Sequence, residues 1–151
     1  MDWIRKRAAE ARKQEKHTKW LANKGRLIES HSGKYFEELS RLMEKSVAAF
    51  NAEFPEPVRQ IEKFERSLHR FVAERKSVPT VRLECRLDYA GNFVRYQYIR
   101  THTWRNKTYR YDGCLEFDVS GKHEVLLHSA DLVPMKVEQV TQFLLEPFFE
   151  F

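Results

Sequence analysis

The sequence predicts an α+β fold with N-terminal helices, a four-stranded antiparallel β-meander and a C-terminal helix covering one sheet face. Apolar residues recur every three or four positions before residue 75 and after residue 134, which is typical of amphipathic helices. Between residues 81 and 119 they alternate with polar residues, as in half-buried strands, and short turn sequences separate these segments. With 151 residues, of which 42% are hydrophobic, the chain has the size of one ordinary domain.

The first 30 residues are predicted to form a basic helical arm, and residues 31–151 a single compact α+β domain. Asp2 can cap a helix that starts at Trp3. Every residue of 12–19 is polar or charged, so a helix there must stand in solvent or against a partner. The sequence Ser-His-Ser-Gly at 30–33 then predicts a break, with Ser32 as the cap of a new helix.

Two further helices are expected before the sheet. Apolar residues spaced by three and four predict a helix over 35–50, which the Pro-rich stretch 54–57 ends. The same spacing predicts a helix over 58–75. Its last third, from His69 to Lys76, has the alternative of being a strand that leads into a hairpin.

The predicted meander consists of four strands, at 81–89, 93–104, 109–119 and 123–129. The segments between them, such as Ala90-Gly91-Asn92 and Ser120-Gly121-Lys122, have turn composition, and short turns imply antiparallel neighbours. A final helix is expected to start near Pro134 and to end or kink at Pro147.

The Phe-rich end of the chain is too apolar to remain in water. It either packs onto the sheet or meets another subunit. With two apolar residues of the arm, it supplies the candidate association residues: Trp20, Leu21, Phe148, Phe149 and Phe151.

Charge is distributed unevenly along the chain. Residues 1–26 hold nine Lys or Arg and three acids, a net charge of +6, whereas residues 112–151 hold two Lys and eight acids, a net charge of −6. The basic start favours a polyanionic partner, but opposite ends can equally attract each other within one chain or between two copies.

Nucleic-acid binding is one interpretation of the basic segments. The stretch 93–110 holds five Lys or Arg and no acid, interleaved with aromatic residues that could stack on bases. In the alternative interpretation its tyrosines pack in the core while its arginines face water. The candidate nucleic-acid-binding residues are Arg5, Lys6, Arg7, Arg12, Lys13, Lys16, Lys19, Arg95, Tyr96, Tyr98, Arg100, Trp104, Arg105 and Lys107.

The sequence gives little support for catalysis. None of the six histidines has a spacing that singles out an acid–base pair, and phosphate-binding, zinc-protease and nucleophile-elbow motifs are absent. By their alternation, Cys85 belongs to the core face of its strand and Cys114 to the opposite face of another, so they cannot bond or chelate a metal together. We expect no catalytic residue, no cofactor and no metal site.

The leading hypothesis is a non-enzymatic interaction protein that acts through self-association, as a homodimer, or as an adaptor. The alternative is a nucleic-acid-binding module that uses the basic arm and the 93–110 strand. A third hypothesis, an acid–base ribonuclease, would use His102, His123 or His128 with Glu84 or Glu124. No apolar run is long enough to cross a membrane, and we expect a cytoplasmic protein without a membrane or small-molecule partner.

Overall fold

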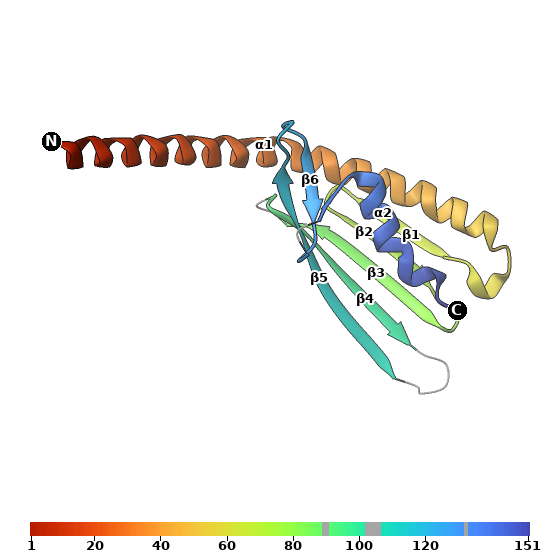
Figure 1. The fold of residues 1–151 in the computed structure, drawn as a ribbon. Coiled ribbons are helices and arrows are strands. Elements are labelled where there is room, and N and C mark those ends of the chain that lie inside the picture. Colours follow the sequence, from red (N-terminus) through yellow and green to blue (C-terminus); the bar gives the residue numbers. More distant parts are fainter. Residues whose placement is uncertain (89–90, 102–106, 132) are drawn as a thin grey trace.

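The computed structural model describes residues 1–88, 91–101, 107–131 and 133–151 (Figure 1). One long helix, α1, is followed by an antiparallel sheet and a short C-terminal helix, α2. The elements in chain order are α1 Asp2–Glu53, a 3-10 turn Pro57–Arg59, β1 Lys63–Ser67, β2 Arg70–Arg75, β3 Thr80–Leu87, β4 Phe93–Thr101, β5 Thr108–Val119, β6 Val125–His128, β7 Pro134–Met135, α2 Val137–Leu145 and a 3-10 turn Glu146–Phe149.

Helix α1 is continuous through residues 30–33, so the predicted break there is wrong. The Ser30 hydroxyl donates to the carbonyl oxygen of Arg26 at 2.9 Å, which satisfies it within the helix. Ser32 is buried rather than a cap. A Cβ on Gly91, in the turn after β3, would lie 2.7 Å from the Ser32 hydroxyl. The small side chain of Ser32 therefore permits the close approach of this turn to α1. This contact accounts for a serine at a position where the sequence suggested the cap of a new helix.

The predicted helix over 58–75 is also wrong, and the alternative for its last third is closer to the structure. This segment holds a 3-10 turn and the antiparallel pair β1 and β2, joined by the two residues Leu68 and His69. Both faces of β2 are largely covered, with Phe71, Val72 and Ala73 all buried. In a strand that is covered on both faces, apolar and polar residues need not alternate along the sequence. The apolar spacing in this segment therefore resembled that of a helix by coincidence.

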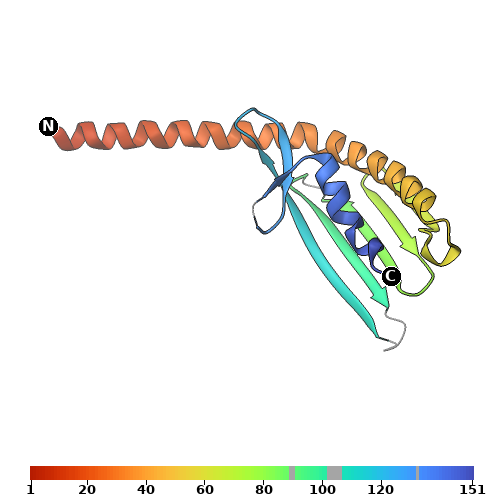
Figure 2. The same cartoon turned by 45° about the vertical axis from the view of Figure 1, so that its right-hand side comes forward.

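The sheet contains seven strands in sequence order, β1 to β7, with every neighbouring pair antiparallel. It is curled into a half-barrel around α2 and the second half of α1 (Figures 1 and 2). The predicted four-stranded meander with helices covering one face is therefore wrong. The error comes from the β1–β2 hairpin and the short β7, which lack an alternating pattern of their own.

The core fills the inner side of the half-barrel. Phe36 of α1 stacks on Phe71 of β2 with ring centroids 5.6 Å apart, and both rings are fully buried. From α2, Val140 and Leu144 are fully buried against the sheet side of the core. Burial of these apolar side chains is the main source of the free energy of folding.

A buried arginine anchors the end of the chain to the sheet. The guanidinium of Arg75, fully buried at the end of β2, donates to the carbonyl oxygens of Pro79 at 3.0 Å, Phe148 at 2.7 Å and Glu150 at 3.0 Å. Burial lowers the pKa of this guanidinium, and nearby Arg100 lowers it further. Charge-assisted hydrogen bonds to three carbonyls compensate for the desolvation of the cation.

Candidate functional site

The first part of α1 extends away from the rest of the molecule (Figures 1 and 2). Every residue of 1–19 except Ala8 is exposed, and the first residue of α1 that is fully packed into the core cluster is Ile28. At a rise of about 1.5 Å per residue, residues 2–19 alone form a rod of about 27 Å. We call residues 2–19 the projecting arm.

The arm meets the body where α1 passes the hairpin between β5 and β6. The Lys24 ammonium forms an ion pair with Asp118 at 2.5 Å and lies 5.3 Å from the centre of the Trp20 ring. Partial burial alone would raise the pKa of Asp118, but the hydrogen bond from Lys24 and the Val119 N–H lower it. These contacts fix the direction in which the arm leaves the body.

Most of the predicted basic residues of the arm share one side of the helix. At about 100° per residue, Arg5, Arg12, Lys16 and Lys19 fall within a sector of about 60°. The sector contains no acid, since Glu10 and Glu15 lie outside it. Of the remaining predicted residues, Lys6 and Lys13 lie within about 80° of the edge of this sector and Arg7 lies on another side. The structure therefore brings four of the seven predicted arm cations into one stripe, which we call the basic stripe.

The predicted site on 93–110 is divided between the two faces of the sheet. Tyr96 and Tyr98 are buried on the inner side, where the Tyr98 hydroxyl donates to the carbonyl oxygen of Leu144 at 2.6 Å. Neither ring is available for stacking on bases. Arg95 points outward, whereas Arg100 forms an ion pair with Glu150. Lys107 is exposed, and the remaining two residues of this prediction, Trp104 and Arg105, lie outside the described residues.

The predicted association residues also have different environments. Trp20 and Leu21 are about half exposed on α1, at 51% and 48%. Phe148 is fully buried in the core and cannot meet a partner. The other two, Phe149 and Phe151, remain half exposed and pack at the end of α1, where their ring centroids lie 5.1 and 6.4 Å from that of Phe50.

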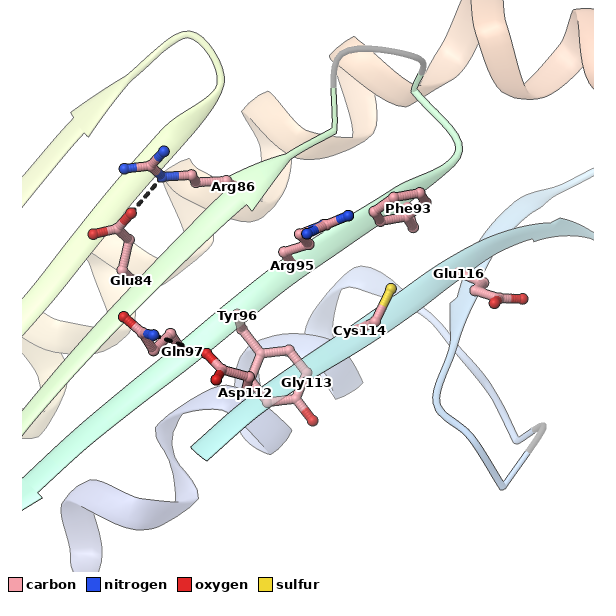
Figure 3. A pocket seen from close by; sticks show the side chains of 10 residues that line it. All are labelled: Glu84, Arg86, Phe93, Arg95, Tyr96, Gln97, Asp112, Gly113, Cys114 and Glu116. Atoms are coloured by element: carbon pink, nitrogen blue, oxygen red, sulfur yellow. Dashed lines mark hydrogen bonds and ion pairs between the residues drawn. The ribbon is translucent and has the colours of Figure 1, made fainter. Parts of the chain in front are cut away.

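The outer face of β3, β4 and β5 carries a shallow groove of about 690 Å³ (Figure 3). Arg86 and Arg95 are directly opposite each other on β3 and β4, and Cys114 follows next to Arg95 on β5. Partial burial and neighbouring Glu116 raise the pKa of the Cys114 thiol, so its thiolate is disfavoured. The groove is lined by both basic and acidic side chains, so it does not resemble a binding site for either anions or cations.

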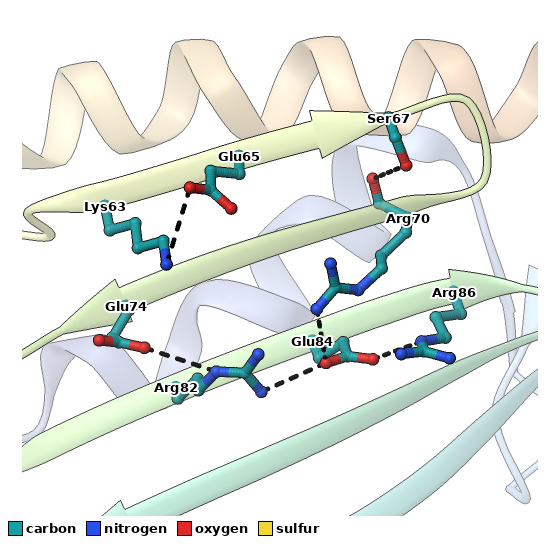
Figure 4. A network of polar contacts seen from close by, with 8 residues as sticks. All are labelled: Lys63, Glu65, Ser67, Arg70, Glu74, Arg82, Glu84 and Arg86. Atoms are coloured by element: carbon teal, nitrogen blue, oxygen red, sulfur yellow. Dashed lines mark hydrogen bonds and ion pairs between the residues drawn. The ribbon is translucent and has the colours of Figure 1, made fainter.

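A network of ion pairs covers the outer face of β2 and β3 (Figure 4). The Glu84 carboxylate forms ion pairs with the guanidinium groups of Arg70 at 3.1 Å and Arg82 at 3.2 Å, and a third ion pair with Arg86. The hydrogen bond from Arg70 is the main reason that the pKa of Glu84 is lowered from 4.5 to about 2, with Arg86 adding to it and burial opposing it. The alternation of Arg82, Glu84 and Arg86 is the sequence signal for this network, although by itself it indicates only the polar face of a strand.

Acid titration should reveal the contribution of this network. Because the pKa of Glu84 is lower in the folded state, its carboxylate stabilises the fold above pH 4.5, and this contribution is lost as the pH falls towards 2. We expect Glu84→Gln to cost about 2 kcal/mol of unfolding free energy at pH 7 and much less near pH 2. Urea unfolding at several pH values measures this difference.

The exposed Glu65, which has a single ion pair with Lys63 at 3.6 Å, provides the matched control. Glu65→Gln makes the same change in charge and should alter stability by less than about 0.5 kcal/mol. A destabilisation by Glu84→Gln that is the same at pH 7 and pH 3 would contradict the role given to the Glu84 carboxylate.

Of the histidines named in the ribonuclease hypothesis, His123 and His128 are not brought together with Glu84 of β3. His128 lies on β6, with its Nε2 3.9 Å from a carboxylate oxygen of Asp118, whereas His123 lies in the turn before β6. His102 lies outside the described residues. Cys85 is buried and Cys114 exposed, so the prediction of opposite faces is confirmed. Burial raises the pKa of the Cys85 thiol.

Residues 1–88, 91–101, 107–131 and 133–151 contain no group of three or more His, Cys, Asp or Glu side chains placed to hold a metal ion. Within the same ranges, no helix combines the length and apolar character that crossing a membrane requires.

Comparisons with known proteins add no functional assignment to this geometry. No protein-family model, no curated protein and no solved structure matches the chain.

Proposed function

We propose that this protein is an interaction protein without a catalytic role, which acts through self-association or as an adaptor. The observation that carries the proposal is the projecting arm, a rod of about 27 Å whose residues are exposed on all sides. Because its residues are exposed, the arm lacks the tertiary packing that supplies most of the stability of helices in proteins. A partner that packs against it would supply the missing stabilisation.

Apolar side chains on the exposed part of α1 support this proposal. Trp3 and Ile4 near its start, and Trp20 and Leu21 near the body, are between 46% and 66% exposed. Packing these side chains against another protein would remove apolar surface from water and would favour association.

Sedimentation velocity of the full chain between 1 and 200 µM tests self-association directly. We expect a concentration-dependent dimer, together with slower amide hydrogen exchange in residues 2–19 at the higher concentration if the arm takes part. A strict monomer over this range, with unprotected arm amides throughout, would remove self-association from the proposal.

Nucleic-acid binding is the second candidate, and the basic stripe is the observation that favours it. Four cations over 15 residues of one helix side can neutralise phosphates and release their counterions. The buried rings of Tyr96 and Tyr98 remove most of the aromatic platform from this candidate. The arm alone would then provide binding without reading the sequence.

A salt titration with a duplex oligonucleotide tests this candidate. Replacing Arg5, Arg12, Lys16 and Lys19 by Gln should make the slope of log K against log salt concentration shallower by about three to four, since each phosphate contact contributes roughly 0.9. Fluorescence anisotropy between 50 and 200 mM salt provides the measurement.

A charge-matched control separates the stripe from net charge. Replacing the exposed body residues Lys34, Lys45, Lys76 and Lys122 by Gln removes the same four charges and should leave the slope close to that of the natural chain. Equal slopes for the stripe variant and the natural chain would exclude the arm from nucleic-acid binding.

A further inference from the structure

Strand β5 is longer than the strand that follows it in the sheet. Residues 108–117 of β5 pair with β4 or with the turn before β4, but only residues 116–119 pair with β6 (Figures 1 and 2). Within the part of the chain that the structure describes, residues 108–115 therefore form a free sheet edge. At the other side of the sheet, β1 lies beside α1, where Arg66 and Glu44 form an ion pair at 2.8 Å.

The backbone groups that face this free edge follow from the hydrogen bonds of β5. The Phe117 N–H donates to the carbonyl oxygen of Asn92, on the β4 side. Because successive residues of an antiparallel strand point their N–H and C=O to opposite sides, Arg110, Asp112 and Cys114 direct theirs to the free edge. Unpaired backbone groups of a sheet edge can pair with another chain, and proteins often prevent this with Pro or Lys on the edge strand; 108–115 contains neither residue.

We propose that this edge binds the same edge of a second copy of the chain, antiparallel, with the two-fold axis at Tyr111. This inference rests on the self-association alternative of the proposed function, and it specifies which surface of the second copy is bound. Residues 108–114 of the two copies would form a continuous ladder that joins the two sheets.

Charge selects this register. Only even-numbered residues of β5 direct their backbone N–H and C=O groups to the edge, so each hydrogen-bonded pair must join two even-numbered residues. The midpoint of such a pair is a residue of the strand, and the two-fold axis must therefore pass through a residue. An axis at Arg110 places two arginines directly opposite, and an axis at Asp112 places two aspartates opposite, which is destabilising. An axis at Tyr111 instead places each Arg110 opposite Asp112 of the other copy, so that two pairs of opposite charge form on the same face.

The two side chains are available for these pairs. Arg110 and Asp112 are both exposed on the outer face of β5, and the structure gives Arg110 no ion pair among the described residues. Asp112 accepts one hydrogen bond, from the Gln97 amide at 2.8 Å, which orients its carboxylate and leaves further acceptor positions.

The inner face of the edge adds apolar area to the same interface. Tyr111 is 60% exposed and would lie opposite Tyr111 of the second copy. Phe143 of α2, 39% exposed, lines the same side of β5 together with Tyr111. Adding a strand beside β5 would remove these rings from water, which favours association beyond the backbone hydrogen bonds.

Charge exchange on the full-length chain tests the proposal. By sedimentation velocity, we expect Arg110→Asp and Asp112→Arg each to weaken dimerisation at least tenfold, because each places two like-charged pairs across the axis. The double variant R110D/D112R exchanges the partners and should restore the dimer to within about threefold of the natural chain. Lys122→Asp, in an exposed turn, makes the same change in net charge as Arg110→Asp and should have no effect.

Cross-linking tests the register itself. In a Cys114→Ser background, which removes the exposed thiol, Tyr111→Cys places two cysteines at a non-hydrogen-bonded pair with Cα atoms about 4.5 Å apart, within disulfide range. Oxidation should give a covalent dimer on a denaturing gel. Arg110→Cys or Asp112→Cys alone should not, because each residue then lies opposite a different one.

The possible failures differ in what they overturn. A monomer at all concentrations overturns both the edge dimer and self-association. A dimer that survives Arg110→Asp and Asp112→Arg but is lost in Trp20→Ser/Leu21→Ser overturns the edge dimer and leaves self-association through α1. Cross-linking of Asp112→Cys with itself, and not of Tyr111→Cys, overturns the register.

Discussion

Arg75→Ala is expected to destabilise the protein by about 3 kcal/mol, since it leaves the carbonyl oxygens of Pro79, Phe148 and Glu150 without their buried donor. The loss should lower Tm by roughly 10 °C for a chain of this size. It should also release the C-terminal turn, whose amides would exchange faster with solvent. Urea unfolding and hydrogen exchange of residues 146–151 measure the two effects.

Two comparison variants show whether geometry or charge is responsible. Arg75→Lys keeps the cation but replaces a planar fork of donors by a single ammonium, so it should still cost more than about 1 kcal/mol. Arg82→Ala removes a partly exposed arginine with two acidic partners, Glu74 and Glu84, and should cost about 1 kcal/mol or less. If Arg75→Ala proves no more harmful than Arg82→Ala, the anchoring role is refuted.

Gly113→Ala is expected to destabilise the protein by about 2 kcal/mol, although alanine normally gains stability over glycine by restricting the unfolded chain. A Cβ at Gly113 would lie 2.0 Å from Cζ and 2.2 Å from the hydroxyl oxygen of Tyr96, its cross-strand partner. The Tyr96 ring is only 5% exposed and contacts Tyr98 and Phe143, so it has little room to move. Near-UV circular dichroism should report the displaced ring.

Gly121 provides the matched control for this substitution. It lies in the β5–β6 turn, and a Cβ there would meet no atom within 4 Å. Gly121→Ala should therefore be neutral or slightly stabilising. Equal unfolding free energies for the two alanine variants would show that Tyr96 yields without cost.

The sequence predicted those elements in which one face alone is buried. Tyr35, Leu39, Met43, Val47 and Phe50 occupy the buried side of α1, as their spacing of three and four indicated. The alternation in β3 likewise matches the structure, where Val81, Leu83, Cys85 and Leu87 are buried. A periodic pattern is reliable when water covers the opposite face.

The errors arose where local pattern and tertiary contact disagree. The β1–β2 turn consists of Leu68 and His69, which are not typical turn residues. The local sequence therefore gives no sign that two strands meet here, and the segment was predicted as one helix. Within 30–33, the small Ser32 lies at the close approach of Gly91 to α1, and the helix continues. The second case depends on a contact with a distant segment, which periodicity along one helix does not contain.

The candidate surfaces were predictable in part. The polar stretch 12–19 within the predicted arm of 30 residues indicated a segment that cannot pack in a core, but the side on which the cations of the arm gather depends on one uninterrupted helix. The free edge of β5 was not predicted, because it results from the different lengths of β5 and β6. Arg110 and Asp112 carried the only sequence signal, a pair of opposite charges two residues apart.

The continuity of α1 has a mechanical consequence. Because a single helix of 52 residues joins the tip to the core, the body sets both the distance and the rotational phase at which the tip presents its side chains. Inserting one residue before Trp20 would move the tip outward by about 1.5 Å and turn it by about 100°. A ligand held at the tip would thus be oriented relative to the half-barrel as by a rigid lever, and a flexible tether of equal length could not do this.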